Sequence, residues 1–262
     1  MITLITDFGT SGPYIGSMKG VILSIHPEVR VVDLTHDIHP QDVDEAAFVL
    51  SRAYAYFPKG TIHVVVVDPG VGSGRAVLAV RTERYIFLAP DNGVLKYIFC
   101  ECPDCQVFRV TNRDFFLESV SHTFHGRDIF APVAAHLSKG MDIETMGEPC
   151  TEYVRGEVRR PEVRPREIRG EIVYIDGFGN GITNIEEGLF AGRAVDRICV
   201  RSHVIDGTSG TYSDVAAGKP LALVGSGGTL EISVSQGNAR ERMAFQKSDA
   251  VIVVLMSKKR SA

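Results

Sequence analysis

The sequence predicts an α/β protein with a layered amino-terminal domain, whose sheet is mostly parallel, and a smaller carboxyl-terminal domain that is β-barrel-like. First, short β-type runs alternate with amphipathic stretches up to about residue 150, as in a parallel sheet covered by helices. Second, short strands with frequent Gly turns follow beyond about residue 160, a spacing typical of small barrels and sandwiches. Third, a length of 262 residues suits two domains.

A charge-dense segment separates these two patterns. It contains Pro161 and Pro165, and prolines in a highly charged segment favour an extended connection. We therefore expect an amino-terminal domain over residues 1–154, a linker over residues 155–169 and a carboxyl-terminal domain over residues 170–262.

The expected strands of the amino-terminal domain are Met1–Thr6, Val29–Leu34, Thr61–Val67, Ala76–Arg81, Tyr85–Leu88 and Gln106–Val110. Of these, Thr61–Val67 is apolar on both faces, which indicates a place in the middle of the sheet. Helical periodicity predicts helices over Pro13–Ile25, over Gln41–Tyr56, from the turn at Gly93 to about Phe99, and over His125–Leu137.

The expected strands of the carboxyl-terminal domain are separated by turns that contain glycine. They are Gly170–Ile175, Gly181–Ile185, Arg197–Val200, Pro220–Val224, Thr229–Val234 and Ala250–Met256. This pattern favours a small barrel or sandwich over a second Rossmann-type unit.

Charge and hydropathy limit the partners of the protein. With 28 Lys and Arg against 32 Asp and Glu, the formal net charge of −4 disfavours nucleic-acid binding and favours a small-molecule ligand. The apolar runs are far shorter than the about 20 residues that a membrane helix needs, so no membrane span is expected. Because the chain starts with a strand-like segment and not with a basic and then apolar leader, we expect a cytoplasmic protein.

The chain has five cysteines, and three of them lie close together at Cys100, Cys102 and Cys105. A zinc site needs a fourth ligand at suitable spacing, which the isolated Cys150 and Cys199 do not supply, so no metal site is expected. Reduced cytosolic thiols are the favoured interpretation, with a redox-sensitive pair as the alternative.

Two acidic residues follow expected strands at the edge where open α/β sheets bind ligands. At Asp7, after the first strand, a carboxylate either accepts from the hydroxyls of a ribose diol or caps its own turn. Asp68 follows the apolar strand Thr61–Val67 and opens a Gly-rich loop that ends at Arg75. The loop lacks the Gly-Lys-Ser/Thr ending of a triphosphate site, so its acid and guanidinium form either a functional pair or a structural ion pair.

His125 stands where a helix is expected to begin. The positive end of a helix dipole lowers the pKa of a histidine and favours the neutral imidazole, which can accept a proton. A packed or surface histidine is the alternative interpretation.

The carboxyl-terminal domain has two turn segments with ligand-binding chemistry. In Asp176–Asn180, the amide of Asn180 matches the edge of adenine and Phe178 can flank a purine, but the segment would equally form an ordinary β-turn. Gly225–Gly228 is a tight turn that either lets the backbone approach a ligand or closes a hairpin.

Taken together, short segments in both domains resemble one family, the S-adenosyl-L-methionine hydroxide adenosyltransferases, which are related to fluorinating and chlorinating enzymes. Each segment is a weak signal by itself, but their common order over nearly the whole chain is specific. The segments are Ile5–Gly9, Val32–His36, Val67–Gly72, Ala89–Gly93, Thr123–Asp128, Asp176–Asn180, Thr211–Asp214 and Gly225–Gly228.

The resemblance implies that water or hydroxide attacks C5′ of the ribose in S-adenosyl-L-methionine and releases L-methionine and adenosine, without a metal or further cofactor. It also implies a homotrimer in which each ligand lies between the amino-terminal domain of one subunit and the carboxyl-terminal domain of its neighbour. In the family a triad of Asp, Arg and His prepares the water, and it falls here on Asp68, Arg75 and His125. Arg75 would favour the deprotonated water, and either Asp68 or His125 would take the proton.

The resemblance further assigns contacts to the nucleoside part of the substrate. Asp7 would hold the ribose diol, Phe178 and Asn180 would hold the adenine, and Tyr212 would lie on the purine or sugar face.

At the methionine end of the substrate, the resemblance places Asp176 and Ser226 near the amine, with Glu231 as a candidate neighbour. The Arg with which relatives clamp the methionine carboxylate is Gly227 in this chain, so the resemblance assigns no carboxylate contact.

Two positions depart from the halogenating relatives. Gly126 stands where they carry a Ser beside the halide, and Val71 stands where they carry a Thr, so the hydroxyls that hold a halide are missing. Hydroxide is therefore the expected nucleophile. The alternatives are a halide-using adenosyltransferase and a non-catalytic module that binds adenosine or S-adenosyl-L-methionine.

Overall fold

The computed structural model describes residues 1–256, which divide into two compact units. Unit 1 comprises Met1–Val158, and unit 2 begins at Arg159. Each unit has a sheet and a hydrophobic core of its own.

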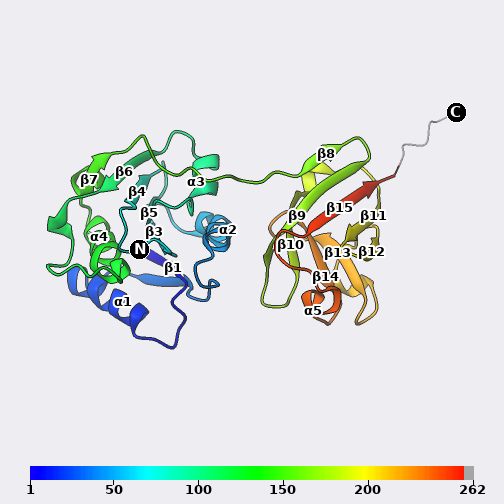
Figure 1. Cartoon of the computed structure of the whole chain (residues 1–262), viewed down its shortest axis with the longest axis horizontal. Helices are drawn as coiled ribbons and strands as arrows, with labels where there is room; N and C mark the ends of the chain where they lie inside the picture. Colours follow the sequence, from blue (N-terminus) through cyan, green and yellow to red (C-terminus); the bar gives the residue numbers. More distant parts are fainter. Residues whose placement is uncertain (257–262) are drawn as a thin grey trace. The chain divides into compact units, whose positions relative to one another are not determined.

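Unit 1 is built on a seven-stranded sheet in the order β2-β1-β3-β5-β4-β6-β7 (Figure 1). The strands are β1 (Ile2–Thr6), β2 (Val31–Thr35), β3 (Ile62–Val66), β4 (Val77–Arg81), β5 (Ile86–Pro90), β6 (Gln106–Val110) and β7 (Gly147–Pro149). Strands β2, β1, β3 and β5 run parallel, whereas β4 is antiparallel to both β5 and β6, and β7 is antiparallel to β6. The predicted α/β fold is confirmed, with the parallel strands at one end of the sheet.

Helices cover both faces of this sheet and give three layers (Figure 1). They are α1 (Tyr14–Ile25), α2 (Val43–Ala53), α3 (Lys96–Glu101) and α4 (Ala131–Ser138). On one face, Met18 of α1 shares a core with Val64, and on the other face Leu50 of α2 shares a core with Val65. Strand β3 is buried on both faces, as its apolar sequence predicts.

Helix α2 begins at Val43 and not at Gln41 as predicted. Gln41 has a φ of 66°, which lies outside the right-handed helical region, and the Asp42 side chain then caps the helix by accepting the Glu45 N–H at 2.9 Å. The predicted end at Tyr56 also differs, because Tyr54–Tyr56 form a 3₁₀ turn.

Unit 2 is an antiparallel sheet in the order β12-β11-β15-β9-β10-β14-β13, with β8 paired to β9. Its elements are β8 (Glu162–Arg164), β9 (Glu167–Ile175), β10 (Gly181–Glu186), β11 (Val195–Val200), β12 (His203–Asp206), β13 (Pro220–Val224), β14 (Thr229–Val234), α5 (Ala239–Met243) and β15 (Ala250–Leu255). An isolated bridge joins Ser209 to Leu223 in β13, so the segment after β12 meets the opposite end of the sheet. The sheet is thus nearly closed, and the predicted barrel-like architecture is confirmed.

The segment 155–169 is not an irregular linker throughout. Strand β8 and the start of β9 form a hairpin within it, in which Val163 pairs with Ile168. All residues of β8 are exposed, and charged residues are common on exposed edge strands, so charge and proline content do not separate such a hairpin from a linker. The short elements β7, β12 and α5 were likewise not predicted.

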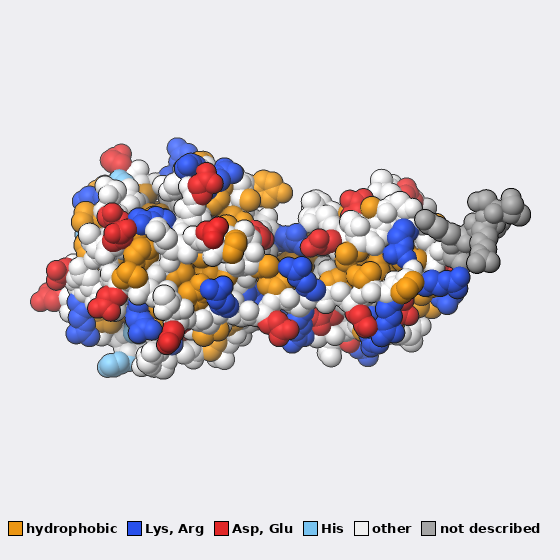
Figure 2. All heavy atoms as spheres, turned by 90° about the horizontal axis from the view of Figure 1, so that it is seen from above, with side chains coloured by type: hydrophobic (Ala, Val, Ile, Leu, Met, Phe, Trp, Pro, Cys, Tyr) orange, Lys and Arg blue, Asp and Glu red, His pale blue; other side chains and the backbone are white. Residues whose placement is uncertain are grey.

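Acidic and basic side chains are interspersed on the face of the molecule shown in Figure 2. Over residues 1–256, no helix is long and apolar enough to cross a membrane. The same residues include no group of three or more His, Cys, Asp and Glu side chains placed to hold a metal ion, and none of their five cysteines forms a disulfide.

Candidate active site

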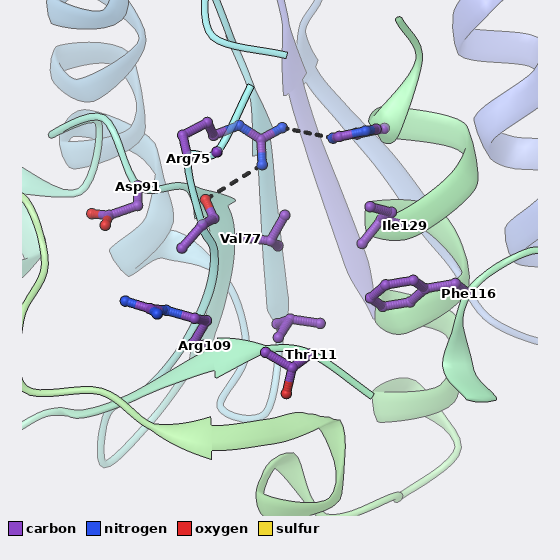
Figure 3. Close-up of a pocket in the computed structure, with 11 residues that line it drawn as sticks. Arg75, Val77, Asp91, Arg109, Thr111, Phe116 and Ile129 are labelled. Carbon is purple, nitrogen blue, oxygen red and sulfur yellow. Dashed lines mark hydrogen bonds between the residues drawn. The ribbon is translucent and has the colours of Figure 1, made fainter. Parts of the chain in front are cut away.

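The candidate residues of unit 1 lie at the edge of the sheet where the parallel strands end. Thr6 of β1 and Val66 of β3 are register partners, so Asp7 and Asp68 follow neighbouring strands at the same edge. A pocket of about 390 Å³ opens beside Arg75 and His125 (Figure 3). Its lining residues are Gly74, Arg75, Ala76, Val77, Asp91, Arg109, Val110, Thr111, Phe116, His125 and Ile129.

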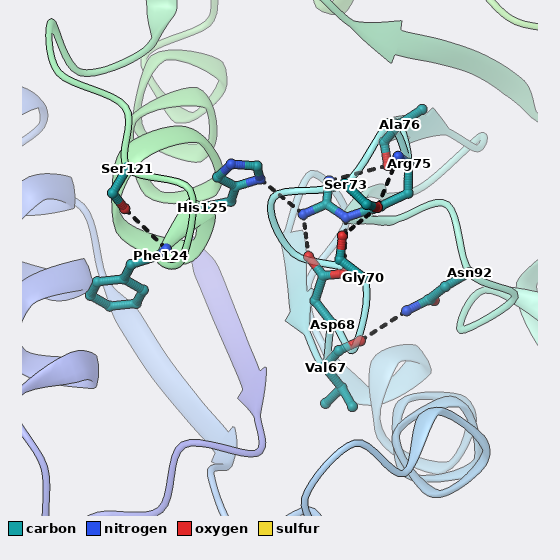
Figure 4. Close-up of polar contacts among 10 residues, drawn as sticks. All are labelled: Val67, Asp68, Gly70, Ser73, Arg75, Ala76, Asn92, Ser121, Phe124 and His125. Atoms are coloured by element: carbon teal, nitrogen blue, oxygen red, sulfur yellow. Dashed lines mark hydrogen bonds and ion pairs between the residues drawn. The ribbon is translucent and has the colours of Figure 1, made fainter.

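Asp68, Arg75 and His125 form one hydrogen-bonded chain (Figure 4). Arg75 Nε donates to Asp68 Oδ1 at 2.9 Å, while Arg75 Nη2 donates both to Asp68 Oδ2 and, at 3.1 Å, to His125 Nδ1. The Asp68 and Arg75 side chains are only 5% and 11% exposed. The structure therefore brings together the three residues that the sequence identifies as catalytic candidates.

This hydrogen-bonded chain determines the protonation of His125. A guanidinium can only donate, so His125 Nδ1 is an acceptor and the ring proton lies on Nε2. Burial lowers the pKa of His125, and the charge of Arg75 lowers it further. Burial and the charge of Arg75 thus both favour the neutral imidazole.

The loop between β3 and β4 holds the acid and the guanidinium at a fixed separation. Ser73 Oγ donates to the Gly70 carbonyl at 2.6 Å and accepts the Arg75 N–H at 3.3 Å. The Asn92 side chain donates to the Val67 carbonyl at 3.0 Å and ties the loop to the end of β5. Asn92 belongs to the segment Ala89–Gly93 of the family resemblance, but its position in the sequence does not reveal the contact with Val67.

Gly72 allows this loop to pass close to the backbone of His122. Its φ is 76°, and a Cβ atom would lie 2.2 Å from the His122 carbonyl oxygen. We expect Gly72→Ala to lower the free energy of unfolding by more than about 1 kcal/mol. The thermal unfolding midpoint should fall by at least about 2–4 °C. Gly74→Ala is the matched control, because a Cβ there meets no atom within 4 Å. Equal midpoints for the two variants would contradict this prediction.

His125 precedes a π-helical turn, Gly126–Phe130, which continues into α4, so the predicted regular helix from His125 is wrong for its first turn. The buried carboxylate of Asp128 accepts the Ser121 N–H at 2.8 Å and the Arg127 Nε–H at 2.6 Å. Asp128 thereby ties the segment before His125 to the turn that follows it. Nothing in the sequence indicates this role, although Asp128 ends the family-like segment Thr123–Asp128.

Gly126 lies against an apolar wall. A Cβ atom there would be 3.2 Å from Met18 Sδ, 3.2 Å from the Phe124 ring and 3.4 Å from the Phe8 ring. The Phe8 and Phe124 rings meet edge to face, with 5.7 Å between their centroids. A side chain at this position would require these neighbours to shift by a few tenths of an ångström, so Gly126 is enclosed by apolar groups and offers no hydroxyl to a halide.

Asp7 does not cap its own turn. Its Oδ2 atom accepts the N–H of Gln41, at 2.8 Å, from the segment that leads into α2. This contact fixes the half-buried carboxylate of Asp7 at the edge of the sheet.

In unit 2, Asp176 closes the turn that carries Phe178 and Asn180. Its Oδ1 atom accepts the N–H groups of Phe178 and Asn180 at 2.9 and 2.8 Å, and its Oδ2 atom accepts from Asn180 Nδ2 at 2.9 Å. The turn leaves the Phe178 ring 79% exposed, whereas Asn180 is buried. The segment is thus a hydrogen-bonded turn that presents an aromatic ring to solvent.

A second polar cluster in unit 2 is centred on Glu231, which is 6% exposed. Glu231 Oε1 accepts from Tyr212 Oη at 2.8 Å and from Ser233 Oγ at 2.7 Å. Burial and the hydrogen bond to Glu231 raise the pKa of Tyr212 to about 12, with a further contribution from the nearby Asp176. Gly181, directly after the Asp176 turn, pairs with Ile232, which follows Glu231, so the turn and this cluster lie close together.

The Gly225–Gly228 segment is the hairpin turn between β13 and β14, closed by a bond from the Gly228 N–H to the Gly225 carbonyl at 2.9 Å. A Cβ atom at Gly225 would lie 2.7 Å from Glu231 Oε2, so this turn passes against the buried carboxylate. Ser226 at the tip is exposed.

Comparison with known proteins identifies related domains over most of the chain. The family model described as the SAM hydroxide adenosyltransferase N-terminal domain matches residues 2–147, and the model described as the C-terminal domain of the same family matches residues 170–252.

Individual relatives cover nearly the full chain. An (R)-S-adenosyl-L-methionine hydrolase of Thermus thermophilus is 34% identical, covering 94% of this chain and 96% of its own length. A fluorinase of Nocardia brasiliensis is 30% identical over 71% of each chain. The crystal structure of an uncharacterised conserved protein from Thermotoga maritima is 36% identical, covers 97% of this chain and all of its own, and superposes with a TM-score of 0.91.

Proposed function

Because this chain belongs to the SAM hydroxide adenosyltransferase family, we propose that it hydrolyses S-adenosyl-L-methionine to adenosine and L-methionine. In this proposal Asp68, Arg75 and His125 activate the attacking water. The observation that carries it is the hydrogen-bonded chain of these three side chains at the edge of the sheet.

The N–H donors of Arg75 explain how the three hydrogen-bonded side chains act on water. Its Nε–H and both Nη2 N–H groups are directed to Asp68 and His125, while Nη1 makes one long contact, 3.4 Å, with the Ala76 carbonyl. Nη1 carries two N–H groups, so at least one of them is available to water, as is the Nε2–H of His125. Donors of this kind stabilise hydroxide more than water, and they therefore lower the pKa of a bound water.

Asp68 is the better acceptor for the proton of this water. Each of its carboxylate oxygens accepts one bond from Arg75 and keeps further lone-pair capacity. His125 Nδ1 already accepts from Arg75 and could take a proton only by losing that bond. We therefore assign the proton to Asp68, which it reaches through a second water because Asp68 contacts Arg75 Nε and Nη2 and not Nη1. From Asp68 the proton passes to solvent.

The substrate needs no acid to release its leaving group. The oxygen of the attacking water forms a bond to C5′ while the C5′–S bond breaks, and the electron pair of that bond neutralises the sulfonium to a thioether. The barrier then lies in placing a desolvated nucleophile in line with the C5′–S bond, which is a task of positioning. No step in this scheme requires a metal ion or a cofactor.

The remaining candidates supply substrate contacts in this proposal. Asp7 receives the ribose diol, and Phe178 with Asn180 receives the adenine. Tyr212 contacts the purine or the sugar. At the methionine end, the carboxylates near the amine are Asp176 and Glu231, with Ser226 beside them.

We further propose a cytoplasmic homotrimer, in which one subunit provides the activating triad and its neighbour provides the adenine and methionine contacts. The proposal is supported by the family membership and by the distribution of the candidates, since the triad belongs to unit 1 and the adenine and methionine candidates belong to unit 2.

The direct test is incubation of the purified protein with S-adenosyl-L-methionine in the presence of chelator and without added halide, followed by chromatography. Equal amounts of adenosine and methionine are expected, and the same rate is expected without chelator. Because relatives are named for the (R) epimer at sulfur, we expect the (R) epimer to be hydrolysed faster than the (S) epimer. Stoichiometric binding of both epimers without product would favour a binding module.

A halide-using adenosyltransferase is the second candidate, since fluorinases are among the relatives. The apolar packing around Gly126 opposes it. Formation of a 5′-halogenated nucleoside that depends on added fluoride or chloride would favour the halide reaction over hydrolysis.

A further inference from the structure

The pocket beside the triad has an exposed mouth and an apolar floor. Gly74, Arg109 and Thr111 at its rim are exposed, whereas Val77, Val110 and Ile129 are at most 7% exposed. In Figure 3, Arg75 lies at one end of the pocket and Thr111 at the other, with the apolar side chains between them. The pocket therefore connects the surface of unit 1 to the guanidinium of the triad.

Only part of the triad lines this pocket. Arg75 and His125 contribute to its wall, but Asp68 and the ribose candidate Asp7 do not. Arg75 Nη1 contacts the carbonyl of Ala76, another lining residue, and has an N–H available to water. The pocket thus reaches Arg75 at its water-binding donor and is distinct from the residues assigned to the ribose.

We propose that this pocket is the water chamber of the enzyme. It delivers the attacking water to Arg75 Nη1 and His125 while the adenosyl group occupies the Asp7 side. The inference rests on the proposed hydrolysis, which consumes one water and releases one proton in each turnover. At roughly 30 Å³ per water molecule, a volume of about 390 Å³ holds about a dozen waters.

The composition of the pocket suits water and small hydroxylic molecules. Polar groups stand at both ends, with Arg75, its partner His125 and Asp91 at one end and Arg109 and Thr111 at the other (Figure 3). The apolar side chains between them offer no polar group that would hold a water permanently. Water needs 2–4 polar partners to become fixed, so molecules over this floor exchange readily. A nucleophile that is consumed in every cycle requires such exchange.

Filling the pocket from its exposed rim tests the proposal without altering the core. We expect Thr111→Leu and Thr111→Trp to lower kcat progressively, the Trp variant by at least tenfold, with binding of S-adenosyl-L-methionine changed by less than twofold. Lys139→Trp is the matched control, because Lys139 is an exposed residue at the end of α4 and does not line the pocket. Its kcat should equal that of the unmodified protein.

The rate constant kcat is measured from adenosine release. Substrate affinity is measured by calorimetry, at an enzyme concentration low enough that little substrate is hydrolysed during the titration. The third measurement is the thermal unfolding midpoint. A Thr111→Trp variant with kcat within twofold of the unmodified protein would overturn the water chamber and leave the proposed hydrolysis standing. A loss of kcat matched by an equal loss of substrate affinity would also overturn it. Absence of turnover in the unmodified protein would instead overturn the proposed function, and the chamber with it.

Discussion

Replacement of Arg75 by lysine is expected to lower kcat for S-adenosyl-L-methionine hydrolysis by about 10²–10³-fold, the loss typical of removing one preorganised donor from a developing anion. Arg75 bridges Asp68 with two nitrogens and also reaches His125. A lysine ammonium is a single nitrogen and cannot keep these contacts in one plane while binding water. Adenosine release at saturating substrate measures the effect.

The same residue also distinguishes a catalytic pair from a structural one, an alternative that the sequence leaves open. Arg75→Met would leave the Asp68 carboxylate, 5% exposed, without its cation and should destabilise the protein by about 3–5 kcal/mol. Adding Asp68→Asn removes the unpaired charge, so the double variant should recover most of that stability. It should not recover activity, because the donor to water is still absent.

Urea unfolding and kcat separate the catalytic role from the structural one. Both are measured on the unmodified protein, on Arg75→Lys, on Arg75→Met and on the double variant Arg75→Met/Asp68→Asn. A double variant that is both stable and active would show that Asp68 and Arg75 only stabilise their loop. Full activity of Arg75→Lys would likewise contradict the proposed role of the guanidinium.

The layers of the fold could be predicted because the local pattern of apolar and polar residues indicates which faces of each strand and helix are buried. The apolar run at Thr61–Val67 indicates a central strand, and β3 is indeed buried on both faces. The start of α2 could not be predicted in the same way, because the positive φ of Gln41 is imposed by its surroundings and not by its side chain. The hairpin of β8 was missed because an exposed, charged edge strand has the composition of a linker.

The candidate site was only partly predictable from the residues themselves. Asp68 and Arg75 share one loop, so their pairing is a local expectation, but His125 comes from a distant segment and reaches Arg75 only through the tertiary fold. The sequence offers only a helix dipole as a reason for a neutral His125, whereas burial and the neighbouring Arg75, which also favour that state, are set by the tertiary fold. Contacts such as Glu231 with Tyr212 depend on strand register, which spacing alone does not specify.

Acidification from pH 7 to pH 4 is expected to remove about 3 kcal/mol of folding stability through a single side chain, His63. This residue of β3 is fully buried; its Nδ1 atom lies 2.8 Å from Thr3 Oγ1, and its Nε2 atom has no hydrogen-bond partner among the described residues. Aromatic rings surround it, with Phe87 stacked at 5.2 Å and Tyr85 at the same distance. Burial lowers its pKa from 6.5 to about 4.

The sign of the effect follows from proton uptake. Below pH 6.5 the unfolded chain binds a proton at His63 that the folded chain refuses until about pH 4, so stability is full above pH 6.5 and falls as the pH approaches 4. With a pKa of about 4 in the folded state and 1.36 kcal/mol for each pKa unit, the loss reaches about 3 kcal/mol at pH 4, where half of the folded molecules have taken up the proton. Burial also lowers the pKa of His125 and His136, which adds a decline of the same sign.

The double variant Thr3→Val/His63→Phe isolates the contribution of His63, because it replaces the hydrogen-bonded pair by apolar groups of similar shape. Between pH 6.5 and pH 4, the unfolding free energy of the double variant should decline by about 3 kcal/mol less than that of the unmodified protein. His122→Gln, at an exposed histidine, should keep the original pH dependence. If urea unfolding at intermediate pH values gave parallel curves for the double variant and the unmodified protein, His63 would be protonated in the folded state, and the aromatic enclosure would admit a charge.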